Sequence, residues 1–483
     1  MAQPCARDAS VILILPLFRT SKLEHRRSNI EGCGCNLSRE RLAWPRAGAG
    51  PSIRGSGPPV KPVARVEPPI ASAASCTTRS ARNPRDSPYH RAVVLVIGLM
   101  SGTSADGVDA ALVEWPDREV ARPYRLVGFC QHPFPDELQA RIHRLAAGKV
   151  PSGEALRELA DLDVLLGERF AEAALAVVRQ AGLEMATIDA VASHGQTVAH
   201  HPELRASLQI GNPSLIAERT GCTVVADFRT RDLAAGGEGA PLAPFFHLVA
   251  LADPEEDRVA LNLGGIANLT WLPRAAAPGD VVAFDVGPAN ALIDGVVALL
   301  SSGAERMDRD GRRARRGRIH AGLLERLLDD EFLRRRPPKS TGRERYGSAQ
   351  AQALIVEARR DALADDDLVA TLVAFTAQAV ADACRDFLAD EGSAPPSLDR
   401  LLVGGGGAEN PALLESLRER LPAVVVEPFD AVGVPGRAAE AMAFSLMGRN
   451  ALLGIPNHLP RCTGAASAVV LGTVVPGRKG LQL

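Results

Sequence analysis

Blocks of apolar residues alternate with glycine-rich polar turns from residue 92 onward. The first block contains Val93, Val94, Val96 and Ile97. A continuous run of β-branched residues is typical of a strand covered on both faces. The run ends in a polar, glycine-containing segment, and apolar residues resume at Val108. The pattern therefore predicts a strand, a tight turn and a second strand.

The rest of the chain reads as an alternation of strands and helices. After a strand at 126–130, the spacing predicts helices at 135–147 and 152–180, a short strand at 190–193 that ends at His194, and a strand at 223–226. A second series follows, with strands at 259–263, 269–272, 281–284 and 401–403, and a helix at 412–420. We therefore expect an α/β protein with two sheet-containing domains.

The first turn has the chemistry of a phosphate-binding loop. Glycines let backbone N–H groups approach an anion, and Thr103 and Ser104 add hydroxyl donors. Asp106 and Asp109 would repel a phosphate unless a cation lies between them, and a magnesium nucleotide supplies one. The segment matches neither the Walker loop nor the dinucleotide fingerprint. A plain Gly-Ser hairpin between two strands is the alternative.

Two later turns repeat this arrangement. Gly264 and Gly265 follow the strand at 259–263, and a run of four glycines at 404–407 follows the strand at 401–403. Asp285 stands at the end of the strand at 281–284. Ligand groups in open α/β sheets lie at such strand ends. Three strand-to-glycine transitions indicate a nucleotide held between two domains.

Composition limits the class of protein. The chain has 483 residues and a formal net charge of −2, which argues against a nucleic-acid partner. No apolar run approaches the roughly 20 residues that span a bilayer, so we expect no membrane segment. Residues 1–91 are rich in Pro, Arg, Ser and Gly and show no periodicity, which predicts a disordered tail, a targeting segment or a misassigned start. The eight cysteines have no metal-type or disulfide-type spacing, so we expect a cytoplasmic protein.

Eight motifs together resemble one known family, the anhydro-N-acetylmuramic acid kinases, which belong to the superfamily of sugar kinases, actin and heat-shock ATPases. The motifs are GLMSGTSADGVD at 98–109, SHGQT at 193–197, DFRTRD at 227–232, GGEGAPL at 236–242, NLGGIAN at 262–268, PKSTGR at 338–343, GGGGAENP at 404–411 and TGA at 463–465. They occur in family order, and the resemblance covers about residues 94–477. The resemblance implies an actin-like, two-domain ATPase fold with a nucleotide cleft between the domains.

The resemblance implies domain I at 92–256 and domain II at 257–483, with the last ~20 residues returning to domain I. It also implies a homodimer. The implied reaction uses ATP and magnesium to phosphorylate O6 of 1,6-anhydro-N-acetylmuramic acid while water opens the anhydro bridge at C1. A carboxylate near the anomeric carbon would serve as the base. The family motif gives that role to Asp285, and binding of magnesium or its water shell is the alternative role.

The remaining assignments follow the family motifs residue by residue. The expected nucleotide-binding residues are Gly102, Thr103, Ser104, Ala105, Asp106, Gly107, Val108, Asp109, Gly264, Gly265, Gly404, Gly405, Gly406, Gly407 and Asn410, with Asp106 and Asp109 as magnesium ligands. The expected amino-sugar-binding residues are His194, Gln196, Thr197, Asp227, Arg229 and Glu440. Arg229 is expected to pair with the lactyl carboxylate, since a guanidinium binds a carboxylate bidentately. A histidine satisfied within the fold is the alternative for His194, and orientation of Arg229 is the alternative for Asp227 and Asp232.

The sequence departs from the family pattern at four positions. Val286 and Ala289 stand where the family has threonine and glycine, Glu238 stands where it has glutamine, and Ala105 replaces a larger apolar residue in the first turn. These changes remove no essential carboxylate, and they bear more on the identity of the sugar than on the phosphoryl transfer. A kinase of another sugar is one alternative function. A noncatalytic actin-like ATPase would not need the clusters at 194–197 and 227–242, and a regulator without activity would not need to retain Asp106, Asp109 and Asp285.

Overall fold

The computed structural model describes residues 93–118, 120–342, 345–388, 397–478 and 480. The described residues belong to one compact unit that spans 82–483. The tail expected at 1–91 lies outside the described residues.

The first sheet of the described chain orders its strands β12-β6-β4-β1-β2-β3, with β5 paired to β4. Its strands are β1 (Val93–Ser101), β2 (Gly107–Pro116), β3 (Arg125–Pro133), β4 (Ala190–His201), β5 (Ala206–Ile210), β6 (Thr223–Ala226) and β12 (Thr473–Val475). The strands β1, β2 and β3 are antiparallel, whereas β4 is parallel to β1 and β6 is parallel to β4.

The second sheet repeats the same core topology. Its order is β11-β10-β7-β8-β9, with strands β7 (Arg258–Leu263), β8 (Ile266–Leu272), β9 (Val282–Pro288), β10 (Arg400–Gly404) and β11 (Val425–Pro428). Again three antiparallel strands come first, the fourth strand is parallel to the first, and the fifth is parallel to the fourth. This duplicated order is the actin-like ATPase and sugar kinase fold, so the predicted fold class is confirmed.

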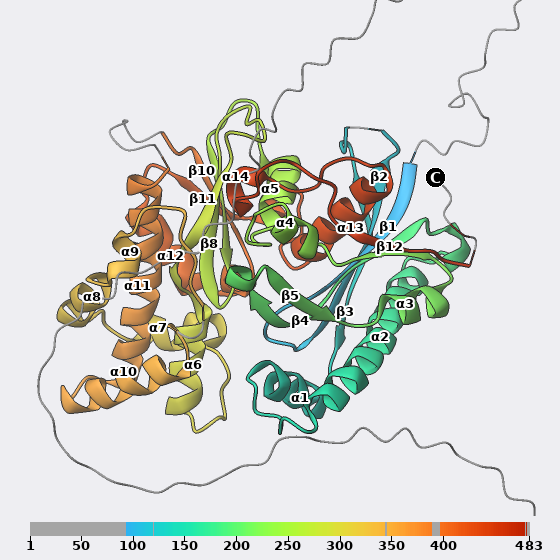
Figure 1. Cartoon of the computed structure of the whole chain (residues 1–483). Coiled ribbons are helices and arrows are strands. Elements are labelled where there is room, and N and C mark those ends of the chain that lie inside the picture. Colours follow the sequence, from blue (N-terminus) through green and yellow to red (C-terminus); the bar gives the residue numbers. More distant parts are fainter. Residues whose placement is uncertain (1–92, 119, 343–344, 389–396, 479, 481–483) are drawn as a thin grey trace, which may run out of the picture. The chain divides into compact units, whose positions relative to one another are not determined.

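Helices cover both faces of each sheet. They are α1 (Asp136–Ala146), α2 (Ala155–Gln180), α3 (Pro213–Thr220), α4 (Thr230–Ala234), α5 (Ala243–Leu251), α6 (Asn290–Leu300), α7 (Arg312–Arg316), α8 (Ala321–Leu328), α9 (Glu331–Arg334), α10 (Ser348–Arg360), α11 (Asp365–Asp386), α12 (Pro411–Arg420), α13 (Ala439–Leu452) and α14 (Pro460–Thr463). Figure 1 shows α1, α2 and α3 grouped on the first sheet and α6 to α12 grouped around the second.

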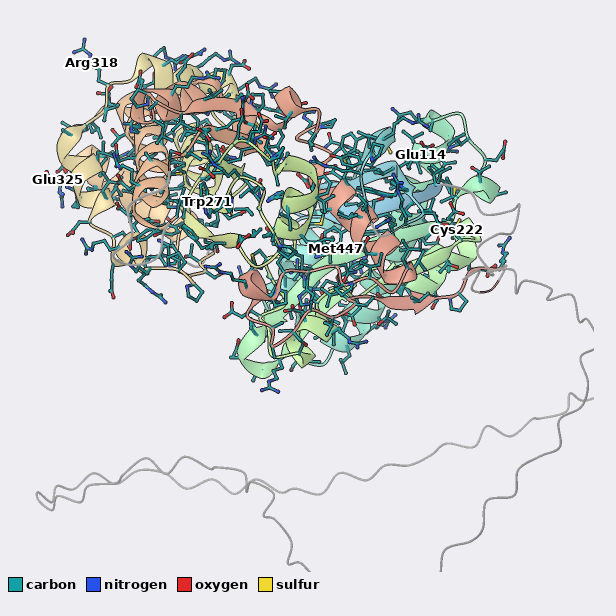
Figure 2. All side chains as sticks on the ribbon, turned by 90° about the horizontal axis from the view of Figure 1, so that it is seen from above. Glu114, Cys222, Trp271, Arg318, Glu325 and Met447 are labelled. Carbon is teal, nitrogen blue, oxygen red and sulfur yellow. The ribbon has the colours of Figure 1, made fainter. Side chains whose placement is uncertain are left out.

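Two helices from different parts of the chain connect the sheets. Helix α13 packs on β1, β2 and β4 of the first sheet, α5 packs on β7 and β8 of the second, and α5 and α13 contact each other. One hydrophobic cluster includes Val96 of β1, Ala260 of β7 and Met447 of α13, all fully buried or nearly so. Figure 2 shows Met447 inside the protein, whereas Arg318 projects outward. The joint between the sheets is therefore a packed apolar core.

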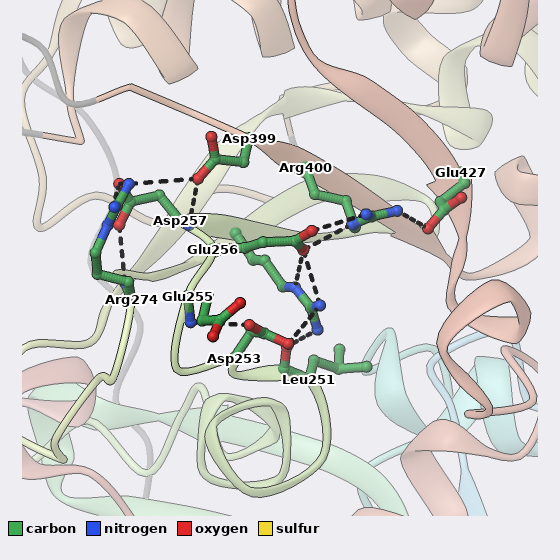
Figure 3. A network of polar contacts seen from close by, with 10 residues as sticks. Leu251, Asp253, Glu255, Glu256, Asp257, Arg274, Asp399, Arg400 and Glu427 are labelled. Atoms are coloured by element: carbon green, nitrogen blue, oxygen red, sulfur yellow. Dashed lines mark hydrogen bonds and ion pairs between the residues drawn. The ribbon is translucent and has the colours of Figure 1, made fainter.

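Ion pairs fasten the second sheet at the starts of its parallel strands (Figure 3). Arg400 donates to Glu256 and to Glu427 of β11, and Arg258 donates to Glu256 and Asp253. Arg400 and Arg258 lower the pKa of the Glu256 carboxyl to about 2, with the hydrogen bond from Arg400 as the main cause. Because these pairs lie at the strand starts, they brace the sheet at the end opposite its glycine turns.

Three sequence expectations need correction. Strand β4 does not end at His194 but continues to His201, because Gly195 (φ +73°) forms an irregular step that lets the strand continue and pair with β5. Asp285 lies within β9 rather than after it, since pairing with β8 continues to Pro288. Helix α11 is long and apolar enough to span a membrane, although the sequence was expected to contain no such stretch. Its apolar window is 83% buried inside the described structure, as in a core helix.

Candidate functional site

The turn between β1 and β2 is tight and partly exposed. The Ala105 N–H donates to Gly102 O at 3.1 Å, and Ala105 has a φ of +49°. A Cβ at Gly107 would overlap the backbone of His132, so this position requires glycine. Thr103 and Asp106 are exposed, whereas the Val108 side chain is fully buried. The turn therefore offers backbone and polar groups to a ligand, but not the side chain of Val108.

Gln196 supports this turn from the neighbouring strand. Its Nε2 donates to Gly102 O at 3.1 Å, and its Oε1 accepts from Ser101 Oγ at 2.7 Å. The Gln196 side chain is buried, and Ser101 Oγ also lies 2.7 Å from Gly107 O. These bonds give Gln196 a role in shaping the turn.

His194 forms a pair with Arg229. The His194 Nδ1–H donates to Gly195 O at 2.8 Å, which leaves Nε2 to accept from Arg229 Nη2 at 2.8 Å. Burial, reinforced by the Arg229 charge, lowers the pKa of His194 to about 3. The ring also lies 4.7 Å from that of Phe444. His194 is thus a neutral acceptor that orients Arg229, and Arg229 Nη1 donates onward to Gly239 O at 2.8 Å.

Several acidic groups influence one another beside this pair. Burial and the charge of Asp106 raise the pKa of Asp109, while a 2.9 Å hydrogen bond from Gln131 opposes the shift. Desolvation and the Asp109 charge likewise raise the pKa of Glu440, and Arg229 opposes that shift. Glu440 is nonetheless reached by solvent. The carboxylates at 106, 109 and 440 therefore generate a negative region that favours a cation or a proton.

Three other expected residues have local partners. Thr197 Oγ1 accepts from Gln209 at 3.1 Å, and Asp227 Oδ1 accepts from the N–H and hydroxyl of Thr230. The fully buried Asp232 accepts from Gly239 N and from Thr463 Oγ1, each at 2.7 Å. Neither aspartate is hydrogen-bonded to Arg229 in the described structure. Asp227 accepts hydrogen bonds from Thr230, the first residue of α4. Asp232 holds the 237–239 loop, whose Gly239 O accepts a hydrogen bond from Arg229.

The two glycine turns of the second sheet pack together. Gly265 O accepts from the N–H groups of Ala289 and Ala291, and Gly264 O accepts from Asn290 N at 3.0 Å. Gly405 (φ +75°) and Gly407 lie so close to Leu263 that a Cβ at either would overlap it, and Gly404 packs on Phe429 in the same way. Gly406 is exposed, with Asn290 as its nearest side chain. Asn410 is buried, and its Oδ1 accepts from Ala412 N at 3.1 Å to cap α12.

Arg437, which the sequence analysis did not single out, connects the glycine segment at 404–407 with Asp109 of the first turn. Arg437 Nη2 donates to Glu409 Oε2 at 2.7 Å, just beyond the glycines at 404–407. Its charge also lowers the pKa of Asp109 against the larger effect of burial. Arg437 precedes Glu440 by three residues, but an arginine before a helix carries no sequence signal of its own.

Asp285 is held by a segment from outside its sheet. Its Oδ2 accepts from Ser340 Oγ at 3.0 Å and from Thr341 N at 2.9 Å, and its own N–H donates to Lys339 O at 3.2 Å. Asp285 is half-buried and Ser340 is exposed. The motif at 338–343 was recognised in the sequence but received no role, because a Pro-Lys-Ser-Thr segment has the composition of an ordinary loop.

Two cavities lie beside helices of the described structure. One of about 610 Å³ lies beside α1 and α2 and is lined by Arg144, Lys149 and Arg157 among others. A second of about 230 Å³ lies between β9 and α11, with Lys339 in its wall. Among the described residues, no three His, Cys, Asp or Glu side chains are grouped closely enough to hold a metal ion. Neither of these two cavities is lined by the residues expected to bind the nucleotide or the sugar.

Comparison with known proteins identifies the family. The family model for anhydro-N-acetylmuramic acid kinase matches residues 94–477. The chain is 40% identical over 394 residues to the anhydro-N-acetylmuramic acid kinase of Caldanaerobacter subterraneus subsp. tengcongensis, covering 80% of this chain and 98% of the relative. It is 44% identical over 392 residues to that of Xanthomonas campestris pv. campestris, covering 80% and 99%.

A solved structure resembles the chain more distantly. It is the (R)-2-hydroxyglutaryl-CoA dehydratase component A of Acidaminococcus fermentans, with 11% identity, a TM-score of 0.36, and coverage of 74% of this chain and 98% of that one. With so low a TM-score, this similarity carries no argument about activity. The duplicated sheets and the clustered glycine turns are those of a kinase in the actin-like superfamily. The chain belongs to the anhydro-N-acetylmuramic acid kinase family.

Proposed function

We propose that this protein is an ATP-dependent kinase that converts 1,6-anhydro-N-acetylmuramic acid to N-acetylmuramic acid 6-phosphate in cell-wall recycling. Family membership over residues 94–477 supports the reaction class. The observation that carries the proposal is the fixed carboxylate of Asp285, oriented by two donors from the 338–343 motif.

The chemistry assigns one proton acceptor and one phosphate-binding region. Asp285 takes a proton from water as its oxygen attacks C1, and the C1–O6 bond breaks with its electron pair moving to O6. O6 then bonds to the γ-phosphorus as the bond to ADP breaks. In this proposal the turns at 102–109 and 264–265 bind the phosphates, and the segment 404–410 binds the adenosine. His194 holds Arg229 toward the substrate carboxylate.

Magnesium fits the acidic region of the first turn. The pKa of Asp109 is raised by burial and by Asp106, so its ionised form is unfavourable without a nearby cation. We therefore assign Asp106 and Asp109 to magnesium, directly or through its water shell. The ion would supply charge neutralisation for the phosphates.

Three of the four departures from the family pattern, at Ala105, Val286 and Ala289, have buried side chains. The side chains of Val286 and Ala289 are buried within the apolar core of the second sheet. Glu238 is exposed, and its N–H donates to Thr463 O at 2.7 Å. The buried positions support retention of the family substrate, and Glu238 is the position at which a different sugar would be accommodated.

Domain organisation and assembly belong to the same proposal. We assign domain I to 92–256 and domain II to 257–483, with the nucleotide between them and the end of the chain returning to domain I, an assignment supported by the pairing of β12 with β6. A cytoplasmic homodimer without nucleic-acid or membrane partners completes the proposal. The four cysteines of the described residues are free, as in a reducing compartment. Sedimentation of the purified protein tests the dimer.

The decisive experiment follows the oxygen of water. The full chain is incubated with ATP, magnesium and the anhydro sugar in heavy-oxygen water, and the products are analysed by mass spectrometry. We expect the label at C1 of the phosphorylated sugar and none in the phosphate. Label in phosphate with the anhydro bridge intact would identify an ATPase, and a phosphorylated sugar with an intact bridge would identify an ordinary sugar kinase.

Replacement of the base tests the role of Asp285. Asp285→Asn should lower kcat by about 10²- to 10⁴-fold, because it removes the proton acceptor, while ATP and sugar still bind. The matched variant Asp280→Asn, at an exposed site, should leave kcat unchanged. Weakened nucleotide binding by Asp285→Asn, with partial rescue by added magnesium, would instead assign Asp285 to the metal.

A further inference from the structure

Lys339 is a buried lysine without a carboxylate hydrogen-bond partner in the described structure. Its side chain is only 6% exposed. The Nζ donates to Leu333 O at 2.9 Å and to Phe332 O at 3.2 Å, both in or beside the short helix α9. Burial of an ammonium group reduces the stability of the fold unless protein groups take the place of water around it. The burial of Lys339 therefore needs a physical explanation.

Three aromatic rings surround the same ammonium. Its Nζ lies 4.6 Å from the ring centre of Phe387, 5.0 Å from that of Phe332 and 5.7 Å from that of Phe284. Ring faces attract a cation, especially where water is excluded. Burial, together with Arg335, lowers the pKa of Lys339 to about 8, although Asp285 and Asp330 oppose the shift. The cage therefore holds a cation at neutral pH through rings and carbonyls.

The residues that follow Lys339 are the ones that bind Asp285. Lys339 O accepts from Asp285 N, and Ser340 Oγ and Thr341 N both donate to Asp285 Oδ2. Phe284, the residue before Asp285, forms one wall of the cage. The 338–341 segment therefore contacts Asp285 directly and, through the Lys339 side chain, also α9 and Phe284.

We propose that Lys339 is a positioning residue, whose caged ammonium fastens the 338–341 segment to α9 and against Phe284 of β9, so that Ser340 and Thr341 hold the Asp285 carboxylate in its reactive orientation. This inference rests on the proposed function of Asp285. Hydrogen bonds donated to a carboxylate favour its ionised form, which is the form that accepts a proton. A displacement of about 1 Å is enough to lower a rate about 100-fold, so a loose segment carries a large kinetic cost.

The test compares Lys339→Met, Lys339→Arg and the matched control Lys149→Met, which lies at an exposed position. Methionine retains the apolar stem but leaves the carbonyls of Phe332 and Leu333 without their donor. Arginine retains a cation for the rings, and the adjoining cavity of about 230 Å³ gives it room. We expect Lys339→Met to lower kcat by about 10- to 100-fold with little change in the KM for ATP, and Lys339→Arg to recover part of that loss.

Hydrogen exchange supplies a readout independent of turnover. The amides of Asp285 and Thr341 should exchange at least about tenfold faster in Lys339→Met than in wild type, since the segment that pairs with them has lost its anchor. Lys149→Met should leave both amides unchanged. If Lys339→Met does not fold, Ser340→Ala removes one of the donors directly, and it should lower kcat without altering the KM for ATP.

The outcomes separate this inference from the proposed function. Wild-type protein that does not open the anhydro bridge contradicts the proposed function, while the exchange measurement still decides whether Lys339 fastens the segment. Normal exchange and a normal kcat in Lys339→Met would overturn the positioning role of Lys339. Equal loss of kcat in the Met and Arg variants would overturn the role of the cation.

Discussion

Asp232→Asn is the substitution whose cost the structure defines best. The Asp232 carboxylate is fully buried and receives hydrogen bonds from Gly239 N and Thr463 Oγ1, each at 2.7 Å. His458 Nδ1 lies 2.7 Å from Asp232 Oδ1. Val469 N–H donates to His458 Nε2, so the proton of the neutral ring is on the nitrogen that faces the carboxylate. Every neighbour is therefore a donor.

An asparagine at 232 keeps the size of the side chain but replaces one acceptor with an N–H₂ group. In either orientation, at least one donor then faces another donor. A hydrogen bond to a charged group contributes about 1.5–3 kcal/mol, and leaving a buried group unpaired adds to the loss. We therefore expect Asp232→Asn to lower the free energy of unfolding by about 2–4 kcal/mol and the melting temperature by about 2–5 °C.

The assay is thermal unfolding of the variant beside the matched control Asp280→Asn. Asp280 is exposed and accepts a single bond from Ala277 N at 2.9 Å, which asparagine can also accept, so its variant should change stability by less than about 0.5 kcal/mol. The KM for the sugar should also rise in Asp232→Asn, because Gly239 O binds Arg229. Equal melting temperatures for the two variants would refute the reasoning.

The pH dependence of this effect has a defined sign. Burial acts to raise the pKa of Asp232, but the hydrogen bonds from His458, Thr463 and Gly239 outweigh it, so the pKa is lower than 3.8. A lowered carboxyl pKa contributes stability above the unfolded value and loses it as the pH falls through the folded value. The difference between wild type and Asp232→Asn should therefore be complete at neutral pH and shrink below pH 3.8.

Two further predictions concern the two sheets separately. Because the pKa of His194 is lowered from 6.5 to about 3, the unfolded chain binds a proton that the native protein does not, and stability falls as the pH drops from 6.5 toward 3. The stability of His194→Gln should therefore depend less on pH over this range. An unchanged pH dependence would contradict a neutral His194. Gly405→Ala should weaken ATP binding measured by calorimetry, because a Cβ at this position, which has a φ of +75°, would overlap Asn262 and Leu263. The control is Gly433→Ala, which also has a positive φ but open space around it, and it should leave ATP binding unchanged.

Much of the fold could be predicted because its signals are local. The apolar runs before Gly102 and Gly264 placed β1 and β7, and Asn410-Pro411 placed the start of α12 within one residue. The part of β4 after His194 could not be predicted, because Gly195 interrupts the pattern of apolar and polar residues. This part of the strand pairs with β5, a partner that the local sequence of β4 does not reveal. The apolar length of α11 was underestimated because alanines and scattered polar residues break up its run, although tertiary packing buries nearly the whole helix.

The site could be predicted in its residue types but not in its connections. Arg229 and His194 lie 35 positions apart, and no periodicity links them, yet their side chains are hydrogen-bonded. The donors to Asp285 come from residues 55 and 56 positions away. Gln196 was expected to contact sugar because the motif contains polar groups, whereas burial beneath the turn assigns its amide to Ser101 and Gly102. Such roles depend on which chain segments meet in space.

The position of α13 and β12 determines the order in which the two sheets can be completed. The second sheet uses only strands between Arg258 and Pro428, so all of its strands are available once that stretch has been synthesised. The first sheet begins at Val93, but the helix that covers it starts at Ala439 and its edge strand ends at Val475. During synthesis the first sheet is therefore started first but completed last. The apolar face on which α13 packs stays uncovered until the end of the chain has been made.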